Sequence, residues 1–448
     1  MQLPSPLAGE GRGGGWRRRS PGSVPAMTGP ASRRAVFAWC LYDWGNSAFP
    51  TVIATFLFSA YFTTAVAPTD AIGTALWGQA TALVGIAVAL ASPVLGAIAD
   101  QGGRRKPWIG VLSAVSIVAT ALMWFVTPDP SAILLALMLY GIASFGFELA
   151  LVFYNAMLPD LAPDDRLGRV SGWGWGLGYF GGLACLALSL ALVQPDPAPF
   201  GLDRAQAEHA RAVAFVVAFW YALFALPLFF LTPDRPRGGL PMATAIRSGL
   251  ATLAGTLKRL PRHRNVLRFL IAKMLYIDGL NTLFAFGGIY AAGTIGMSLE
   301  EVLLFGVIIN ISSGLGAFLF AWVDDWIGAK PTIVIALLAL ILFGSAILFV
   351  EDKTWFYVLA MGIGAFLGPT QAASRSMMAR LAPRELMTEF FGLYALAGRA
   401  TAFLGPFLLG WVTLMTDSQR AGMATILPFF AVGLLLLLGV RETRRALP

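Results

Sequence analysis

The chain has 448 residues, of which 57% are hydrophobic and only 12% are charged, and its mean hydropathy is +0.71. A soluble domain of this length needs far more charged surface, so the composition indicates a protein whose solvent is lipid. In lipid every backbone polar group must be paired internally, which leaves helices or closed barrels. The apolar runs are about 20 residues long, the length that a spanning helix needs. We therefore expect an all-α membrane protein.

Several functional classes lack the residues that they require. The two cysteines, Cys40 and Cys185, lie inside apolar runs, so we expect neither a disulfide framework nor a metal site. No G-x-x-x-x-G-K-[ST] loop is present, which argues against ATP-driven pumping. The net charge of +8 is better explained by Lys and Arg in loops than by nucleic-acid binding. We expect no enzyme activity, no cofactor and no nucleic-acid partner.

Twelve apolar segments are long enough to cross a bilayer as helices. In chain order they are 36–66, 74–99, 108–126, 131–158, 170–192, 211–231, 266–292, 302–323, 331–349, 355–378, 390–415 and 422–440. Gly368-Pro369 in the tenth segment and Gly405-Pro406 in the eleventh predict bends.

Lys and Arg are concentrated in the loops on one side of these segments. That side carries Arg17, Arg18, Arg19, Arg33, Arg34, Arg104, Arg105, Lys106, Arg166, Arg169, the basic connector 235–264, Lys330, Arg380, Arg384, Arg441, Arg444 and Arg445. The opposite side has only Arg204, Arg211, Lys353 and Arg420. The positive-inside rule then predicts a multi-pass inner-membrane protein with both termini in the cytoplasm.

The N-terminal segment has a different composition from the rest of the chain. Residues 1–34 are rich in Gly, Pro and Arg and lack the apolar core of a signal peptide, so we expect a disordered cytoplasmic tail. Met27 is an alternative start. N-terminal sequencing of the native protein that found residues 1–26 would exclude it.

The chain contains an internal duplication. The pattern D-x-x-N-[ST]-x-F begins at Asp43 and again at Asp278, 235 residues later. Two further pairs follow in the same order: the loops that contain Asp100 and Asp325, and the Leu-Ala-Pro turns at 161–163 and 381–383. Repeats in one order predict two related six-helix bundles. We place the bundles at 35–231 and 265–441, a cytoplasmic linker with an amphipathic helix at 232–264, and a cytoplasmic tail at 442–448.

The loop after the second span resembles the signature of the major facilitator superfamily, roughly G-x-x-x-D-[RK]-x-G-[RK]-[RK]. The matching residues are Gly96, Asp100, Gly103, Arg104 and Arg105, and Gln101 departs from the pattern where a basic residue is usual. A finer resemblance is to the autophagy-related vacuolar effluxer family, carried by the phrases LYDWGNSAF at 41–49, VFYNAMLP at 152–159 and GRVSGWGWGLGY at 168–179. These resemblances imply the major facilitator fold and secondary transport, and the fungal family members are associated with amino-acid export from the vacuole.

The signature loop also has a physical interpretation. Asp100 ends the second span where the N-terminus of a neighbouring helix would favour a carboxylate. The basic run that follows can pair with carboxylates and hold the cytoplasmic face in one state, so Gly96, Asp100, Gly103, Arg104 and Arg105 form a candidate gating loop. The alternative is plain positive-inside anchoring of the loop.

Charges at membrane depth are costly, so they are usually functional or paired. Asp43 and Asp278 each lie about 14 Å inside their helices at 1.5 Å per residue. Asn46 and Asn281 follow at i+3 on the same faces. If these residues face inward, they offer acceptors to an ammonium or hydroxyl group of a solute. The alternative is a clasp between helices.

Three more charges lie within predicted spans. Glu148 is a candidate proton carrier, or else forms a permanent ion pair with Arg399 or Lys273. Arg399 can bind a carboxylate as a two-pronged fork. Lys273 lies close enough to the predicted span start to extend to the membrane surface. An anionic cluster with a cationic group suits a zwitterion.

Aromatic side chains accompany these charges. Tyr42 and Trp175 are candidate pathway residues, and Trp173, Tyr154, Tyr179, Tyr276 and Tyr394 can line a pocket, although packing or interfacial roles are the alternative for each. Gly174, Gly178 and Gly182 recur every four residues and allow close helix approach.

We expect a monomeric secondary transporter that moves a small solute, such as an amino acid or related zwitterion, by alternating access with proton coupling through Glu148 or Asp43. The alternatives are a solute-sensing receptor and a membrane-embedded enzyme. The acidic cluster Asp160, Asp164 and Asp165 is what the enzyme alternative would use, but helix capping explains it more simply.

Overall fold

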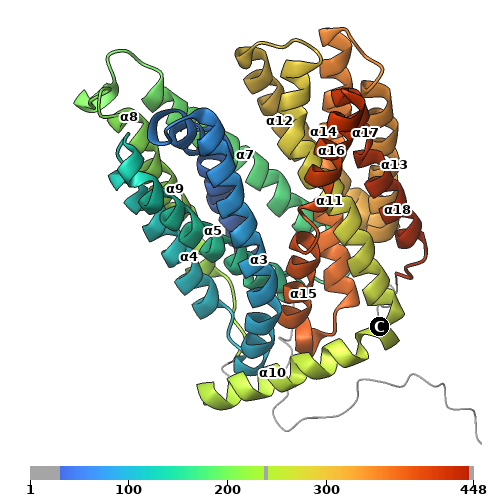
Figure 1. Cartoon of the computed structure of the whole chain (residues 1–448). Helices are drawn as coiled ribbons and strands as arrows, with labels where there is room; N and C mark the ends of the chain where they lie inside the picture. The colour runs from blue at the N-terminus through green and yellow to red at the C-terminus, as the bar shows by residue number, and fades with distance from the viewer. Residues whose placement is uncertain (1–30, 237–240, 443–448) are drawn as a thin grey trace, which may run out of the picture.

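The computed structural model describes residues 31–236 and 241–442, and the described chain is helical without strands (Figure 1). Within those residues, twelve helical segments are long and apolar enough to cross a membrane, which confirms the predicted fold class. Because lipid offers no partner to backbone groups, such segments satisfy their hydrogen bonds internally as helices. The predictions for Met27, Arg444 and Arg445 and for most of the N-terminal tail lie outside the described residues.

The first six spans form one bundle. The first contains α1 (Arg33–Asn46), η1 (Phe49–Phe56), α2 (Phe58–Tyr61) and η2 (Phe62–Val66); the next are α3 (Asp70–Gly102), α4 (Lys106–Leu122) with η3 (Met123–Phe125), and η4 (Pro130–Ala132) with α5 (Ile133–Ala156) and α6 (Leu158–Leu161). The fifth and sixth are α7 (Leu167–Val193), then η5 (Pro199–Gly201) in the loop, and α8 (Glu208–Arg211) with α9 (Val213–Leu231).

The connector and the second bundle follow. The connector holds α10 (Met242–Arg259) and η6 (Leu260–Arg262), and the spans are α11 (Arg264–Gly293), α12 (Leu299–Ile327), α13 (Ala329–Ile347) and α14 (Lys353–Leu381). The eleventh span contains η7 (Arg384–Leu386), α15 (Met387–Arg399) and α16 (Leu404–Thr416), and the twelfth contains α17 (Gln419–Ala424) and α18 (Ile426–Leu438).

The duplicated loops end their helices in the same way. Gly103 follows α3 with a φ of 80°, and Gly328 follows α12 with a φ of 107°. Only glycine adopts this region at little cost, so each glycine lets the chain stop one span and start the next within three residues.

Two spans differ from the uniform helices that the sequence predicts. In the first, Pro50 lies at the start of η1, a π-helical segment, because proline donates no N–H to an ordinary helical ladder. The eleventh span begins at Arg384 rather than near 390 and is interrupted at 400–403, just before Gly405. In contrast, α14 runs without interruption through Pro369.

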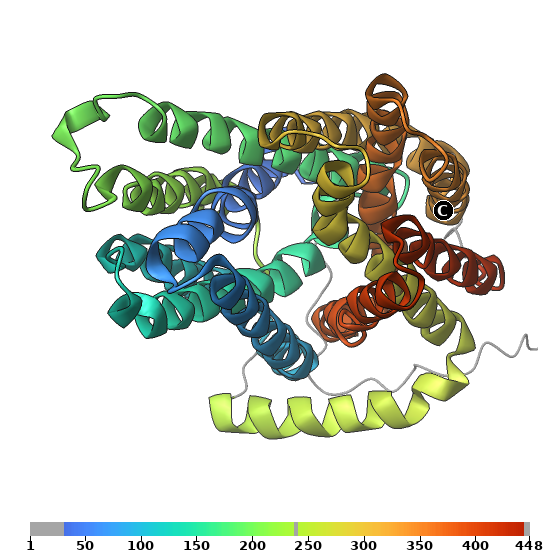
Figure 2. The ribbon, with the colours of Figure 1, turned by 45° about the horizontal axis from the view of Figure 1, so that its top comes forward.

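The two bundles meet at the end on which α10 lies, which we call the α10 side. There α10 extends beneath both bundles, whereas the ribbons diverge toward the opposite end (Figures 1 and 2). The contacts between bundles involve the last part of α3 with α15, and the first part of α7 with α12 and α14. The pairs α3–α15 and α7–α12 are equivalent under the duplication, so the interface itself is repeated.

Candidate functional site

A buried ion pair joins the bundles through α1 and α14. The Arg375 Nη1 atom lies 3.0 Å from the Asp43 Oδ2 atom, and Arg375 is 2% exposed. The same guanidinium donates to the carbonyl of Ser171 at 2.6 Å and to Asn155 Oδ1 at 3.2 Å. A buried arginine is stable only with such a full set of acceptors. The predicted site residue Asp43 therefore meets a partner from the opposite half.

Aromatic rings enclose this guanidinium. Its central carbon lies 4.8 Å from the ring centre of Trp39, 5.8 Å from that of Tyr154 and 5.6 Å from that of Trp175. Cation–π contacts of this kind are strongest where water is excluded. The indole N–H of Trp175 is buried and has no described hydrogen-bond partner.

A second ion pair links the bundles through α5 and α15. The Arg399 Nη2 atom contacts the Glu148 Oε1 atom, and the side chains are 31% and 21% exposed. The pairing of Glu148 with Arg399, one of the two alternatives from the sequence, is thus what the structure contains. This pair is more exposed than Asp43–Arg375, whose side chains are 10% and 2% exposed.

The predicted residues of α11 are not part of these pairs. Lys273 is 4% exposed, so it does not extend to the membrane surface: its Nζ atom donates to the Tyr394 carbonyl at 2.8 Å and lies 3.7 Å from that ring centre. Asp278 is 1% exposed and neither of its carboxylate oxygens has a described partner. Asn281 is half-buried. The two repeated Asp-Asn patterns therefore occupy different environments.

Asn46 and Tyr42 lie inside the first bundle. Asn46 is 2% exposed and its amide nitrogen has no described partner. The Tyr42 hydroxyl contacts Ser113 Oγ at 2.7 Å and the Tyr221 hydroxyl at 2.9 Å. Because both partners belong to α4 and α9, this hydroxyl is directed into the first bundle rather than toward the second.

The signature loop lies at the α10 side, where Asp100 meets the start of α15. Its carboxylate accepts the backbone N–H groups of Thr388 at 3.1 Å and Glu389 at 2.8 Å. The first N–H groups of a helix have no partner within it and carry partial positive charge, so a carboxylate there is favoured. Gly96 permits the approach, since a Cβ atom at this position would meet the Thr388 carbonyl.

Arg105 ties this loop both to its own bundle and to α15, where its Nε atom donates to Thr388 Oγ1 at 3.0 Å. Its Nη1 atom lies 2.5 Å from Asp160 Oδ2, its Nη2 atom lies 3.9 Å from Asp100, and its backbone N–H donates to Asp234 at 2.9 Å. Asp160 also accepts two bonds from Arg235 at 2.9 Å. Burial acts to lower the pKa of Arg235, but these bonds and the Asp160 charge raise it overall, so Arg235 remains a cation. Asp160 is therefore an ion-pair centre and not simply a helix cap.

The remaining signature residues take simpler positions. Arg104 is exposed, and Gly103 forms the turn after α3. Gln101, which departs from the signature, contacts α10: its side chain accepts from Ser248 Oγ at 3.2 Å and approaches Thr252 Oγ1 at 3.5 Å. The missing basic residue is thus replaced by a contact with the connector helix.

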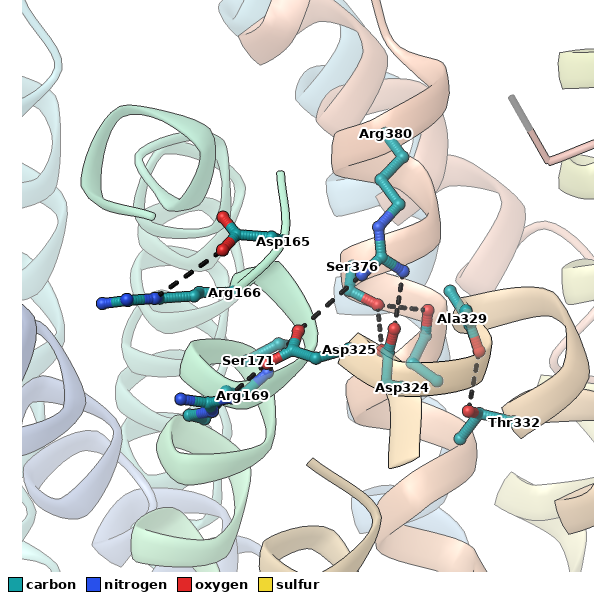
Figure 3. Close-up of polar contacts among 12 residues, drawn as sticks. Asp165, Arg166, Arg169, Ser171, Asp324, Asp325, Ala329, Thr332, Ser376 and Arg380 are labelled. Carbon is teal, nitrogen blue, oxygen red and sulfur yellow. Dashed lines mark hydrogen bonds and ion pairs between the residues drawn. The ribbon is translucent and has the colours of Figure 1, made fainter. Parts of the chain in front are cut away.

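The second copy of the loop repeats this arrangement with its charges exchanged (Figure 3). Asp325 accepts the backbone N–H of Arg169, in the first turn of α7, at 3.1 Å. Its neighbour Asp324 lies 2.5 Å from Arg380, which occupies the position equivalent to Asp160. Glu442 accepts the first N–H groups of α13, and Asp234 accepts the N–H of Arg105, the residue before α4. Each bundle therefore caps a helix of the other.

The predicted glycine repeat of α7 makes its close approach mainly within its own bundle. Gly174, Gly178 and Gly182 face the first span of the same bundle, and Gly174 also lies close to Arg375 of α14. The close approach to α12 is made by Gly168 and Gly172, displaced by two residues from the predicted set.

Two residues of the site were missed from the sequence. Arg375 lies only three residues from the predicted end of its span, where an arginine is normally an interfacial anchor. Asn155 was part of a quoted phrase but carried no charge to mark it. The available signal was their equivalence: they lie 220 residues apart, the same spacing as the Leu-Ala-Pro turns.

Comparison with known proteins identifies the family. The sequence model of the family described as "Vacuole effluxer Atg22 like" matches residues 74–446. An uncharacterized MFS-type transporter of Bacillus subtilis, YxiO, is 28% identical over 411 residues, which cover 90% of this chain and 94% of YxiO. Autophagy-related protein 22 of Yarrowia lipolytica is 25% identical over 308 residues, and the match covers 62% of this chain but only about half, 51%, of that protein.

The fold agrees with this relationship. The proton:xylose symporter XylE, a major facilitator superfamily protein, superposes with a TM-score of 0.67 at 14% identity over 90% of this chain and 94% of XylE. Such a low identity shows the shared fold alone. The family match and the fold together mean that this chain is a membrane transporter of the major facilitator superfamily and belongs to its Atg22-like effluxer family.

Proposed function

We propose that this protein is a secondary active transporter that moves a small zwitterion, such as an amino acid, by rocking its two bundles about a central site. The amino-acid class agrees with what the resemblance to vacuolar effluxers implies, and proton coupling supplies the driving force. The substrate meets the protein between α1, α5, α14 and α15, where both inter-bundle ion pairs lie.

The observation that carries this proposal is the pair of salt bridges between the bundles. Asp43–Arg375 and Glu148–Arg399 must both open if the bundles are to exchange sides. Opening them leaves two anions and two cations that need new partners, since an unpaired buried charge is costly. A zwitterion supplies an ammonium for a carboxylate and a carboxylate for a guanidinium, so it can replace these bonds one for one.

We assign the α10 side to the cytoplasm. The loops of that side carry most of the described Lys and Arg residues, as the positive-inside rule requires of cytoplasmic loops. The bundles meet there, which corresponds to an outward-facing arrangement. The carboxylates of Asp100 and Asp325 favour this arrangement because each stabilises a helix start of the opposite bundle.

Counterflow in liposomes tests the proposal. The purified chain is reconstituted in vesicles loaded with unlabelled amino acids, and entry of the same labelled amino acids is measured. We expect saturable exchange that falls at least tenfold in the double variant Glu148→Gln/Arg399→Gln. The matched control is Glu301→Gln/Lys353→Gln, which removes an exposed pair on the opposite side.

Two outcomes would contradict the proposal. Undiminished exchange in the Glu148→Gln/Arg399→Gln variant would remove this pair from the substrate pathway. Thermal stabilisation by an amino acid without any flux would favour a solute-sensing receptor instead.

A further inference from the structure

The break in the eleventh span joins two segments that belong to different surroundings. The segment α15 packs mainly on α3 of the first bundle and also on α5 there and on α11 of its own bundle, and its last residue, Arg399, pairs with Glu148 of α5. After the break at 400–403, α16 packs on α11 and α17 of the second bundle. Ala400 is exposed, and Thr401 and Ala402 are half-buried. The break therefore allows α15 to change its angle to α16 when α15 leaves α3 and α5.

Asp278 lies on the second-bundle side of this break. It is 1% exposed, and neither of its carboxylate oxygens has a described hydrogen-bond partner. The carboxylate faces the backbone N–H of Gly405, in the first turn of α16. A Cβ atom on Gly405 would collide with Thr282 Oγ1 and lie 3.3 Å from the Asp278 carbonyl, so the two helices are in close contact at this point.

No charge neutralises Asp278 among the described contacts. Seven described elements pack against α11, and two of them, α16 and α18, contain no charged residue. The charged residues of the other five are Glu300, Glu301, Asp324 and Asp325 on α12, Lys353, Arg375 and Arg380 on α14, Glu389 and Arg399 on α15, Arg420 on α17, and Arg262 on η6. On α11 itself the buried Lys273 bonds to Tyr394 instead. Within the described residues no ion pair of Asp278 is present, in contrast to Asp43 and Glu148.

We infer that Asp278 is the proton-binding group that couples transport to a proton gradient, in place of Glu148 or Asp43. Two opposing effects act on it. A buried carboxylate without partners is costly when ionised, which favours the protonated form. The N-terminus of α16 favours the ionised form, but only while α16 stays in place. A metal cation fits less well, because the group that faces the carboxylate is an N–H donor rather than an oxygen ligand.

This inference rests on the proposed function, since it names the driving ion of the same transport cycle. The chain of contacts runs from the Glu148–Arg399 pair through the break to Gly405 and Asp278. Opening the pair releases the end of α15, which changes how α16 meets the Asp278 carboxylate. The proton is thus bound and released in step with the movement of the bundles.

Infrared difference spectroscopy tests proton binding without any substrate. Spectra of the reconstituted chain are recorded between acidic and alkaline buffers, and the carbonyl stretch of protonated carboxyl groups is measured. We expect a component of this band to disappear in Asp278→Asn but to persist in Glu389→Gln, the matched control that removes another buried carboxylate without described partners. If Asp278→Asn does not fold, Asp278→Glu should shift the midpoint of that component.

Several results would overturn the inference. An unchanged band in Asp278→Asn, or an unchanged midpoint in Asp278→Glu, would show that the proton binds elsewhere. Loss of the component on adding sodium chloride but not choline chloride would identify sodium as the bound cation.

A transport arm separates this inference from the proposed function. Asp278→Asn should keep amino-acid counterflow and lose accumulation driven by an imposed pH gradient. Accumulation in that variant equal to the wild type would overturn the inference alone. Absence of counterflow in the wild type would contradict the proposed function, and the infrared result would still decide the proton site.

Discussion

At the scale of single residues, Arg375 has the largest set of contacts between the bundles. Its guanidinium joins Asp43 of α1, Ser171 of α7 and Asn155 of α5 within 3.2 Å. Arg375 and Asn155 are equivalent positions in the duplicated chain, so the two halves meet through one position that is an amide in one half and a guanidinium in the other. The energy of this cluster therefore depends on charge balance.

Removing the cation alone should be more damaging than removing both charges. Arg375→Met leaves Asp43 buried without compensation, which costs about 3–5 kcal/mol. The double variant Asp43→Asn/Arg375→Met should recover most of that stability. A double-mutant cycle of unfolding free energies in detergent measures the coupling, and additive effects would mean that the pair contributes nothing to stability.

Gly174 sets the space that this ion pair occupies. A Cβ atom there would lie 2.6 Å from Asp43 Oδ2 and 2.8 Å from Arg375 Nη2. We expect Gly174→Ala to destabilise the protein by about 1–3 kcal/mol through overpacking. Gly78→Ala is the control, since nothing lies within 4 Å of its Cβ position. Thermal unfolding compares the two, and equal melting temperatures would contradict this account.

At the scale of elements, α10 lies outside both bundles, on the side where they meet (Figure 1). It packs mainly on α3, where Gly249 lies against Ile98 and where Gln101 contacts Ser248 and Thr252. Its exposed face includes Ile246, Leu250 and Leu257, which suits a helix at the membrane surface. The helix is thus held by a few close contacts near its middle.

Two glycines in α10 provide a matched test of this attachment. A Cβ atom at Gly249 would lie 2.9 Å from Ile98, whereas nothing lies within 4 Å of the position at Gly255. We expect Gly249→Ala to loosen α10 and to speed its hydrogen–deuterium exchange severalfold. In Gly255→Ala the hydrogen–deuterium exchange of α10 should be slower or unchanged, because alanine favours the helix by about 1 kcal/mol. Equal effects of both variants would show that α10 is not held at this point.

Most elements could be predicted from the sequence, because apolar length alone decides where a helix can cross a bilayer. The sequence predicts bends at Gly405-Pro406 and at Gly368-Pro369. The structure instead has a break just before Gly405 and an uninterrupted helix through Pro369. The sequence alone does not decide this, because the effect of proline depends on neighbouring helices. Asp100 could be placed at a helix start from its position in the signature. The partners of Asp43 and Asp278 could not, because a side chain's direction about its helix depends on packing between distant segments.

At the scale of the whole molecule, two carboxylates are among the groups that join the bundles at the α10 side. Asp100 belongs to the first bundle and caps α15 of the second, while Asp325 belongs to the second and caps α7 of the first. Both contacts are lost together when that side opens. The balance between the two arrangements of the transporter therefore depends on these two residues.

Removing both carboxylates should expose the interface at the α10 side. In a background with Cys40 and Cys185 replaced by alanine, Ser92→Cys reports on this interface because Ser92 is fully buried against Gly392. A lost bond to a charged group is worth about 1.5–3 kcal/mol, so Asp100→Asn/Asp325→Asn should speed maleimide labelling by about tenfold or more.

The control for this labelling experiment is Asp129→Asn. Asp129 caps the short helix η4 with a 2.8 Å bond to the Ser131 N–H, on the opposite side of the molecule. Labelling should stay at the wild-type rate in this variant. An unchanged rate in the Asp100→Asn/Asp325→Asn variant would mean that the caps do not hold the interface closed.

The exchange of caps between bundles has a consequence for hydration. When Asp100 and Asp325 leave, the first N–H groups of α15 and α7 lose their acceptors, and lipid tails supply none. Only water can replace those carboxylates. Water must therefore enter the interface as the α10 side opens. The permeating solute then moves through a passage that already contains solvent.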